Sequence, residues 1–241
     1  MKLPGINYFI TKKTGKAIHD YRMIKDKDRI LIGVSGQDSM ALASILRARL
    51  KYLPIKYSLE AVHIEMDRRN TAVIKNFLKK IGIRCHVIKI DFEKDKKFLN
   101  KTACFWCSWK RREAIFKMGQ RLGCNKIAFA HHLDDILETL LLNMFYQGEI
   151  STMPPMLKMF KGKFHIIRPF SYIEKAHVKK YAGLNNIPKL PYVCPYGKTT
   201  TRPLMRNIIA TVKKTCPKIK RNLFKSMANI NKDYLPIKGM G

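Results

Sequence analysis

Two cysteines three residues apart form a C-x-x-C pair that could bind a metal or transfer sulfur. Cys104 and Cys107 stand at the entrance of a predicted helix, 107–122, and three cations follow at 110–112. The positive end of the helix dipole and these cations lower the pKa of a thiol, so they favour the thiolate that binds a metal or transfers sulfur. A single C-x-x-C pair fits zinc, an iron–sulfur cluster or a redox-active dithiol.

A third thiol is needed if this pair belongs to a cluster. Cys194 lies in a predicted turn and is the first candidate, with Cys216 as its rival. Three thiolates leave one iron of a 4Fe–4S cluster open to an exogenous ligand, which suits chemistry on a substrate. Cys85, inside a predicted strand, and Cys124, near a helix end, are expected to be buried and outside the site. The chemical alternative is a zinc-bound dithiol that carries a persulfide.

A turn of small and polar residues joins the first predicted strand to the helix that follows. It consists of Ser35, Gly36, Gln37, Asp38 and Ser39. Free amide N–H groups and the positive end of a helix dipole meet at such a turn, which is typical of phosphate binding. The two serine hydroxyls can donate to phosphate oxygens, and Asp38 is placed to cap the helix. The spacing matches neither G-x-x-x-x-G-K-[ST] nor G-x-G-x-x-G, and the alternative is a capped turn without a ligand.

A second polar run follows the fourth predicted strand. His131, His132, Asp134 and Asp135 lie between this strand and the next predicted helix. Carboxylates beside a triphosphate hold Mg²⁺, which neutralises phosphate charge and stabilises the leaving pyrophosphate. The alternative is a capped helix start, in which one aspartate is the N-cap residue. We expect these four side chains to face the same crevice as the small-residue turn.

Short apolar runs alternate with helical patterns in the front half of the chain. Strands are predicted at 29–34, 59–65, 85–90, 126–130 and 164–167, and helices at 38–50, 71–81, 107–122 and 134–146. This alternation predicts an α/β fold with a doubly wound parallel sheet and ligands at the carboxyl ends of its strands. We expect a basic extension at 1–24, the sheet domain at 25–187 and a basic, mostly helical region at 188–241 that contains the third cysteine.

The charge of the chain is unusually positive. Its 241 residues include 48 Lys and Arg but only 17 Asp and Glu, a formal net charge of +31. Such an excess favours a polyanionic partner, with nucleic acid first and an acidic membrane surface second. Candidate contacts to a phosphate backbone are Lys75, Lys79, Lys80, Lys179, Lys180, Lys218–Arg221 and Lys225. Candidate stacking partners for an unpaired base are Trp106, Trp109, Tyr192 and Tyr196.

The hydropathy pattern and the cysteine content predict a cytoplasmic protein without a membrane anchor. No apolar run approaches the roughly 18 residues that a membrane-spanning helix needs. The N-terminus has no apolar stretch followed by a small-residue cleavage site, so we expect no secretory signal. Six cysteines without such a signal fit metal or sulfur chemistry in a reducing compartment.

These segments together resemble the ATP pyrophosphatase (PP-loop) family, whose members adenylate a substrate and release pyrophosphate. The turn at 35–39 is similar to the family's S-G-G-x-D-S loop, but it has five residues where the family loop has six. Residues 130–139 are similar to G-H-x-x-D-D-x-x-x-T, with Ala130 in place of glycine. The patterns C-x-x-C-S-x-x-R-R at 104–112 and H-H-x-D-D-I-L-x-T-L-x-L-N-M-F-Y at 131–146 resemble the tRNA 2-thiocytidine synthetase branch.

The resemblance implies a fold of the adenine nucleotide α-hydrolase type and the activity of an ATP-dependent tRNA sulfurtransferase. ATP would convert a base carbonyl into an adenylate, and sulfide from a 4Fe–4S cluster would displace it. The implied cluster ligands are Cys104, Cys107 and Cys194. The other implied partners are Mg²⁺, the tRNA, a sulfur donor (a cysteine desulfurase or free sulfide) and, since the family is commonly dimeric, a second copy of the chain.

The resemblance also assigns residues to roles. Asp134 and Asp135 are the implied acidic residues of the reaction, and Arg111 would lie near the cluster. The turn at 35–39 would bind ATP, as would His131 and His132. Adenine would lie against the second strand near His63 and Ile64.

Two other functions stay open from the sequence. The first is a related enzyme that forms 2- or 4-thiouridine in tRNA. The second is a non-catalytic protein that binds RNA and a cluster, in which the shortened turn at 35–39 no longer supports ATP hydrolysis. Pyrophosphate release that depends on tRNA distinguishes the enzymes from the binding protein.

Overall fold

The computed structural model describes residues 5–66, 68–90, 103–191 and 201–235. The chain packs into two compact units, which we call the sheet unit and the helical unit. The sheet unit consists of Met1–His132 and Pro154–Thr199, and the helical unit of Leu133–Met153 and Thr200–Gly241. Each unit therefore combines segments that are distant in the sequence.

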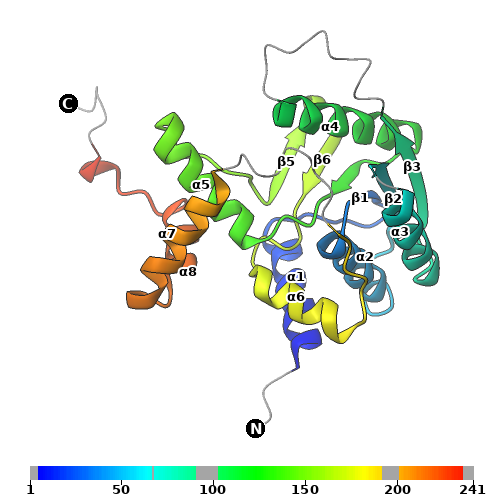
Figure 1. The fold of residues 1–241 in the computed structure, drawn as a ribbon, viewed down its shortest axis with the longest axis horizontal. Coiled ribbons are helices and arrows are strands. Elements are labelled where there is room, and N and C mark those ends of the chain that lie inside the picture. The colour runs from blue at the N-terminus through cyan, green and yellow to red at the C-terminus, as the bar shows by residue number, and fades with distance from the viewer. Residues whose placement is uncertain (1–4, 67, 91–102, 192–200, 236–241) are drawn as a thin grey trace. The chain divides into compact units, whose positions relative to one another are not determined.

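The sheet unit contains a six-stranded sheet in the order β3-β2-β1-β4-β6-β5 (Figure 1). The strands are β1 (Arg29–Val34), β2 (Ser58–Glu65), β3 (Arg84–Lys89), β4 (Lys126–Ala128), β5 (Met156–Met159) and β6 (Phe164–Ile167). All pairings are parallel except that of β5 with β6 at the edge. The predicted doubly wound α/β fold is confirmed. The edge strand β5 is absent from the sequence prediction because none of its four residues is fully buried.

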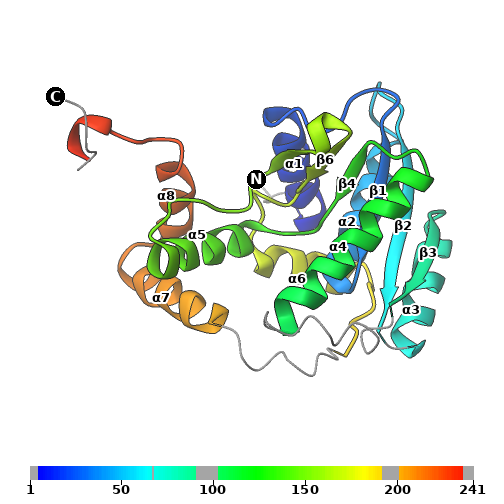
Figure 2. The ribbon, with the colours of Figure 1, turned by 90° about the horizontal axis from the view of Figure 1, so that it is seen from above.

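Helices cover both faces of this sheet (Figure 2). They are α1 (Ile6–Asp20), α2 (Gln37–Arg49), α3 (Arg68–Lys80), α4 (Ala103–Arg121) and α6 (Lys175–Leu184). The apolar sides of α1, α2, α3 and α6 share one core, and α4 packs against the other face. α4 begins four residues before the predicted start at Cys107, so both cysteines of the C-x-x-C pair lie within its first five residues.

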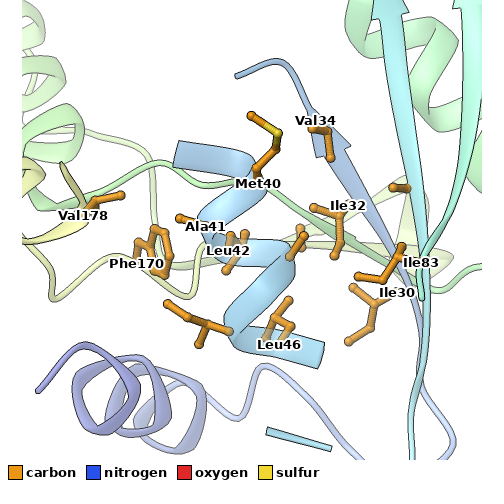
Figure 3. Packing of buried hydrophobic residues seen from close by; sticks show 14 of the residues in the cluster. Ile30, Ile32, Val34, Met40, Ala41, Leu42, Leu46, Ile83, Phe170 and Val178 are labelled. Carbon is orange, nitrogen blue, oxygen red and sulfur yellow. The ribbon is translucent and has the colours of Figure 1, made fainter. Parts of the chain in front are cut away.

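Alternation along β1 explains how both faces are filled. Ile30, Ile32 and Val34 pack into the core with α2, whereas Leu31 packs into the core with α4. Successive strand residues point to opposite faces, so a strand with helices on both sides is apolar throughout. Figure 3 shows the side chains of α2 between the β1 residues and Phe170. The resulting core holds the end of β1 and the start of α2 in place.

The N-terminal basic segment contributes to the core of the sheet unit. It forms α1, in which Ile10 and Ala17 are completely buried. α1 packs beside α6, and Phe9 lies 4.7 Å from the ring of His177 between centroids. The cations of α1 therefore lie on a helix that is anchored by apolar contacts.

The helical unit has a small core of its own. It contains α5 (Leu133–Gln147), α7 (Arg202–Thr215), α8 (Ile219–Ser226) and a short 3₁₀ turn, Lys232–Tyr234. Leu137 and Leu141 of α5 pack against Met205 and Ile209 of α7. In the described parts of both units, no helix has the length and apolarity needed to cross a bilayer.

The order of the strands creates a switch point between β1 and β4. The chain leaves β1 for β2 and β3 on one side and then returns to β4 on the other side. At such a point the connections from two neighbouring parallel strands diverge, which opens a crevice at their carboxyl ends. The turn at 35–39 follows β1, and the segment 129–132 follows β4. The fold therefore brings two of the predicted segments to the edge where α/β sheets bind ligands.

Candidate phosphate-binding site at the carboxyl edge of the sheet

The turn after β1 is closed by the hydroxyl of Ser39. Its Oγ accepts hydrogen bonds from the backbone N–H of Ser35 at 3.0 Å and of Gly36 at 3.1 Å, and it donates to the carbonyl of Gly36 at 2.8 Å. Gly36 occupies the N-cap position of α2, so the prediction that Asp38 caps the helix is wrong. The five-residue turn is therefore held in shape by the hydroxyl of the buried Ser39. The N-cap residue, Gly36, has no side chain that could cap the helix.

The first turn of α2 presents backbone donors to the crevice. The first hydrogen bond of the helix runs from the N–H of Met40 to the carbonyl of Gly36, so the amides of residues 37–39 precede the intrahelical ladder. The space beside the α-carbon of Gly36 is open, since an added Cβ would meet no atom within 4 Å. Amides at a helix N-terminus with open space beside them can accept a phosphate group. Gln37 is anchored through its side chain, whose Nε2 donates to the carbonyl of Ile187 at 2.9 Å.

The segment after β4 crosses the end of β1 at close range. A Cβ on Gly33 would lie 2.8 Å from the ring of Phe129, so a larger residue at this position would force that ring to shift. His132 is 2% exposed, and its Nε2 lies 3.9 Å from Oδ2 of Asp38 in α2. The structure therefore brings His132 and Asp38 together, as the sequence predicts. His131 packs its ring against Phe129, with 5.6 Å between centroids.

His63 supports the end of β1 from the neighbouring strand. Its ring is 5% exposed, Nδ1 donates to the carbonyl of Val34 at 2.8 Å, and Nε2 lies 3.1 Å from the hydroxyl of Thr71. A neutral ring with its proton on Nδ1 accepts a hydrogen bond from the Thr71 hydroxyl at Nε2. The Val34 carbonyl, the His63 ring and the Thr71 hydroxyl then all have hydrogen-bond partners. The neighbouring Ile64 is buried in the core with α4. Both side chains proposed for adenine are thus buried, and contacts of this strand with a base would come from its backbone.

We expect the stability of the protein to fall as pH decreases below about 6.5, in part because of His63. Burial lowers the pKa of His63, and the positive charge of Arg111 lowers it further. The His63 ring of the unfolded chain therefore binds a proton at a higher pH than that of the folded protein. As a result, the free energy of unfolding falls as the pH decreases from the unfolded pKa to the folded pKa. Replacing His63 with Asn should lower the free energy of unfolding at neutral pH by about 1–3 kcal/mol, since the groups it bonds lose their partner.

Urea unfolding of wild type and His63→Asn between about pH 5 and pH 8 tests this expectation. The difference in stability between the two proteins should shrink toward acidic pH. His19→Asn is the matched control, because the His19 side chain is largely exposed. A difference that stays constant with pH would show that His63 is not neutral in the folded protein.

Of the predicted cluster ligands, Cys107 is the one whose side chain the structure describes. It is a half-buried thiol one turn into α4. The rings of Trp106 and Trp109 stack beside it on the same helix at 5.3 Å, with Nζ of Lys110 4.8 Å from the centre of the Trp106 ring. Cys104 lies one turn earlier on the backbone of α4, but its side chain, like the whole of residue 194, lies outside the described residues.

The remaining thiols differ from Cys107 in their surroundings. Burial raises the pKa of Cys85 to about 11 and also raises the pKa of Cys124. Both therefore remain protonated at neutral pH, which disfavours metal binding and sulfur transfer. Cys216 belongs to the helical unit, where the Nδ2 of Asn222 lies 3.7 Å from its sulfur.

The predicted acidic residues lie at the start of α5, in the helical unit, and each pairs with a cation. The Nζ of Lys220 lies 2.6 Å from Oδ1 of Asp134, and Nη1 of Arg202 lies 3.8 Å from Oδ1 of Asp135. Arg206 binds the buried Glu138 through two nitrogens, at 3.0 and 3.4 Å. The hydrogen bond to Glu138 raises the pKa of Arg206. α7 and α8 are thus held to α5 by charge as well as by the apolar core.

These pairings could not be derived from the sequence pattern. Lys220, one of the cations predicted to contact RNA, is bonded to Asp134 instead. The partners of Asp135 and Glu138 stand more than 60 residues later in the chain, and no local spacing indicates them. Among the described residues, no group of three or more His, Cys, Asp or Glu side chains has the arrangement of a metal site.

The sequence as a whole matches the PP-loop domain family over residues 8–229. Two relatives are named tRNA-cytidine(32) 2-sulfurtransferase. The protein of Polynucleobacter necessarius is 35% identical over 94% of this chain and 77% of its own length. That of Geobacter sulfurreducens is 33% identical over 94% of this chain and 91% of its own length.

Solved structures show the same fold. The U34-tRNA thiolase NcsA of Methanococcus maripaludis, solved with its [4Fe-4S] cluster, superposes with a TM-score of 0.76 at 19% identity and covers 94% of this chain and 80% of its own. An NH3-dependent NAD synthetase of Campylobacter jejuni superposes with a TM-score of 0.55 at 12% identity, over 94% of this chain and 93% of its own. The chain therefore belongs to the PP-loop domain family, and within that family it is similar to the tRNA-cytidine(32) 2-sulfurtransferases.

Proposed function

We propose that this protein is an ATP-dependent tRNA sulfurtransferase that converts a cytidine of the anticodon loop, at position 32, to 2-thiocytidine. The observation that supports it most directly is the open N-terminus of α2 at the switch point, where free amides can hold the phosphates of ATP. The names of relatives at 33–35% identity support the choice of nucleotide.

The proposed reaction has two substitutions. The O2 atom of the cytidine attacks the α-phosphorus of ATP, and pyrophosphate leaves. A sulfide then attacks C2 of the base, and the oxygen departs with AMP. The amides of Gln37 and Asp38 would bind the phosphates, and His132 would hold the carboxylate of Asp38. Asp134 and Asp135 are the proposed Mg²⁺ ligands, which requires them to exchange their lysine and arginine partners for the metal.

A 4Fe–4S cluster fits the thiol chemistry at the start of α4. Cys107 offers a half-buried thiol near a helix N-terminus, whereas burial raises the pKa of the Cys85 and Cys124 thiols and keeps them protonated. When bound, the cluster would supply the sulfide at a coordination site that protein does not fill. Cys104 and Cys194 complete the proposed ligand set. Iron analysis should show that Cys194→Ala loses the cluster while Cys216→Ala keeps it, and the reverse result would move the third ligand to Cys216.

Exposed cations on both units are the proposed contacts to tRNA. They are Lys75, Lys79 and Lys80 of α3, Lys179 and Lys180 of α6, and Lys218, Arg221 and Lys225 at α8. Fixed positive charge of this kind binds phosphate backbones with strong salt dependence. We also propose a cysteine desulfurase or free sulfide as sulfur donor and the cytoplasm as the site of action. The exposed Phe145, Tyr146 and Ile150 at the end of α5 are the proposed surface for a homodimer.

Reconstitution tests the function as a whole. Protein purified without oxygen is incubated with unmodified tRNA, ATP, Mg²⁺ and sulfide, and the nucleosides are analysed by mass spectrometry. We expect 2-thiocytidine, together with pyrophosphate release that depends on tRNA. Thiouridine in its place would overturn the assignment of the base, and tRNA binding without pyrophosphate release would favour a non-catalytic protein.

A further inference from the structure

Arg168 is a buried cation that no part of the proposed reaction uses. It follows β6 directly, and its side chain is 6% exposed. Its Nη1 donates to the carbonyl of Pro154, while Nε is buried without a hydrogen-bond partner among the described residues. The backbone N–H of Arg168 donates to the carbonyl of Pro155 at 2.8 Å, so the backbone at this position is held firmly.

The charge of Arg168 is not balanced within the described chain. Among the described residues no carboxylate acts on its charge, and the nearby charge is that of another arginine, Arg112 of α4. Burial lowers the pKa of Arg168 to about 10, and the positive charge of Arg112 lowers it further. A buried guanidinium without an anion is costly, so proteins normally retain one only where an anion is bound.

The position of Arg168 lies at the carboxyl edge of the sheet. Ile167 pairs with Ala128 of β4, and the N–H of Phe129 donates to the carbonyl of Ile167 at 3.0 Å. Arg168 therefore stands beside the segment that carries His131 and His132. In the strand order β1-β4-β6 it is two strands away from the turn at 35–39, a separation of about 10 Å at the usual strand spacing.

We propose that Arg168 and Arg112 form a second phosphate-binding site, separate from the N-terminus of α2. The planar guanidinium fork of arginine matches the oxygens of a phosphate and binds two of them at once. Arg112 is exposed and lies on α4, the helix that also carries Cys107. The inference rests on the proposed function for the source of the phosphate, which is either the RNA backbone or ATP.

Binding measurements with four variants test the proposal. Arg168→Lys keeps the charge and removes the fork, Arg168→Gln removes both, and Arg112→Gln changes an exposed residue that the fold does not need. Arg121→Gln is the matched control, since Arg121 is an exposed arginine at the other end of α4. For each protein one measures the affinity for a non-hydrolysable ATP analogue, the affinity for a tRNA transcript at fixed salt, and the shift of Tm caused by inorganic pyrophosphate.

We expect Arg112→Gln and Arg168→Lys to weaken one of the two affinities about tenfold or more, as for the loss of a charge-assisted hydrogen bond, whereas the control changes neither. Loss of tRNA affinity alone assigns the site to the RNA backbone. Loss of analogue affinity and of the pyrophosphate-induced shift assigns it to ATP. Both results support the site.

Unchanged affinities for both ligands in Arg112→Gln and Arg168→Lys would overturn the proposal, even if Arg168→Gln lowers Tm, because Arg168 would then only support the backbone near Pro154. A wild-type protein that binds neither ATP analogue nor tRNA would contradict the proposed function itself. The two failures are therefore distinguishable.

Discussion

Replacing Gly36 with Ala is expected to reduce tRNA-dependent pyrophosphate release by about 100-fold or more, the effect of losing donors aimed at a reacting phosphate group. Gly36 is the N-cap residue of α2, and the space beside its α-carbon is open in the protein. A methyl group there would occupy room that a phosphate needs to reach the amides of the first turn. Glycine is favoured at positions where the backbone must come close to a ligand.

The same substitution should leave the fold intact. The φ angle of Gly36 is 174°, which is extended backbone that alanine also adopts, and an added Cβ meets no atom. We expect a change in stability within about 1 kcal/mol, or a few degrees in Tm. Gly183→Ala is the matched control, because Gly183 lies on the exposed side of α6 with open space around it. Unchanged pyrophosphate release in Gly36→Ala would exclude the N-terminus of α2 as the phosphate site.

Replacing Cys107 with Ser is expected to abolish thiolation, with residual activity at or below about 1% of wild type, because the thiolate is the form that binds metal and sulfur. A hydroxyl of similar size fills the half-buried position but stays protonated at neutral pH. Affinity for an ATP analogue should be unchanged, because the phosphate site is built from β1 and α2. Nucleoside mass spectrometry and iron and sulfide analysis provide the readouts.

The control for this experiment is another thiol of the same chain. Cys85→Ala removes a half-buried cysteine of β3, whose pKa is raised to about 11 by its partial burial, and the variant should retain full thiolation. The pair of variants separates a general effect of losing a thiol from a specific role of Cys107. Full iron content and thiolation in Cys107→Ser would contradict the proposed ligand set.

The class of fold and the positions of most helices and strands follow from the amino-acid pattern alone. The apolar runs of β1 and β6 have the predicted bounds, because a strand between two layers of helices must be apolar on both faces. The turn at 35–39 and the run at 131–135 are recognisable because small and polar residues interrupt that apolar pattern. The net charge of +31 comes from composition alone and needs no structure.

The hydrogen-bond partners of the polar side chains near the candidate site, in contrast, depend on how the strands and helices pack. The hydroxyl of Ser39 closes its own turn, and His63 is occupied between Val34 and Thr71. Neither partner is visible in residue spacing, because the choice depends on the pairing of β1 with β2 and on where α3 packs. Both side chains therefore stabilise the proposed phosphate site through hydrogen bonds to the protein itself. Their residue types alone would have suggested direct contacts with ATP.

The balance of charges was likewise decided by folding. Asp134 lies 86 residues before its partner Lys220, and the helical unit that unites them joins two segments that are far apart in the sequence. Arg168 looks in the sequence like one more cation of a basic chain, but the fold buries it at the carboxyl edge of the sheet. Hydrophobic periodicity predicts each helix or strand separately, whereas ion pairs and uncompensated charges depend on which helices and strands pack together. The second proposed phosphate site could therefore be inferred only from the three-dimensional arrangement.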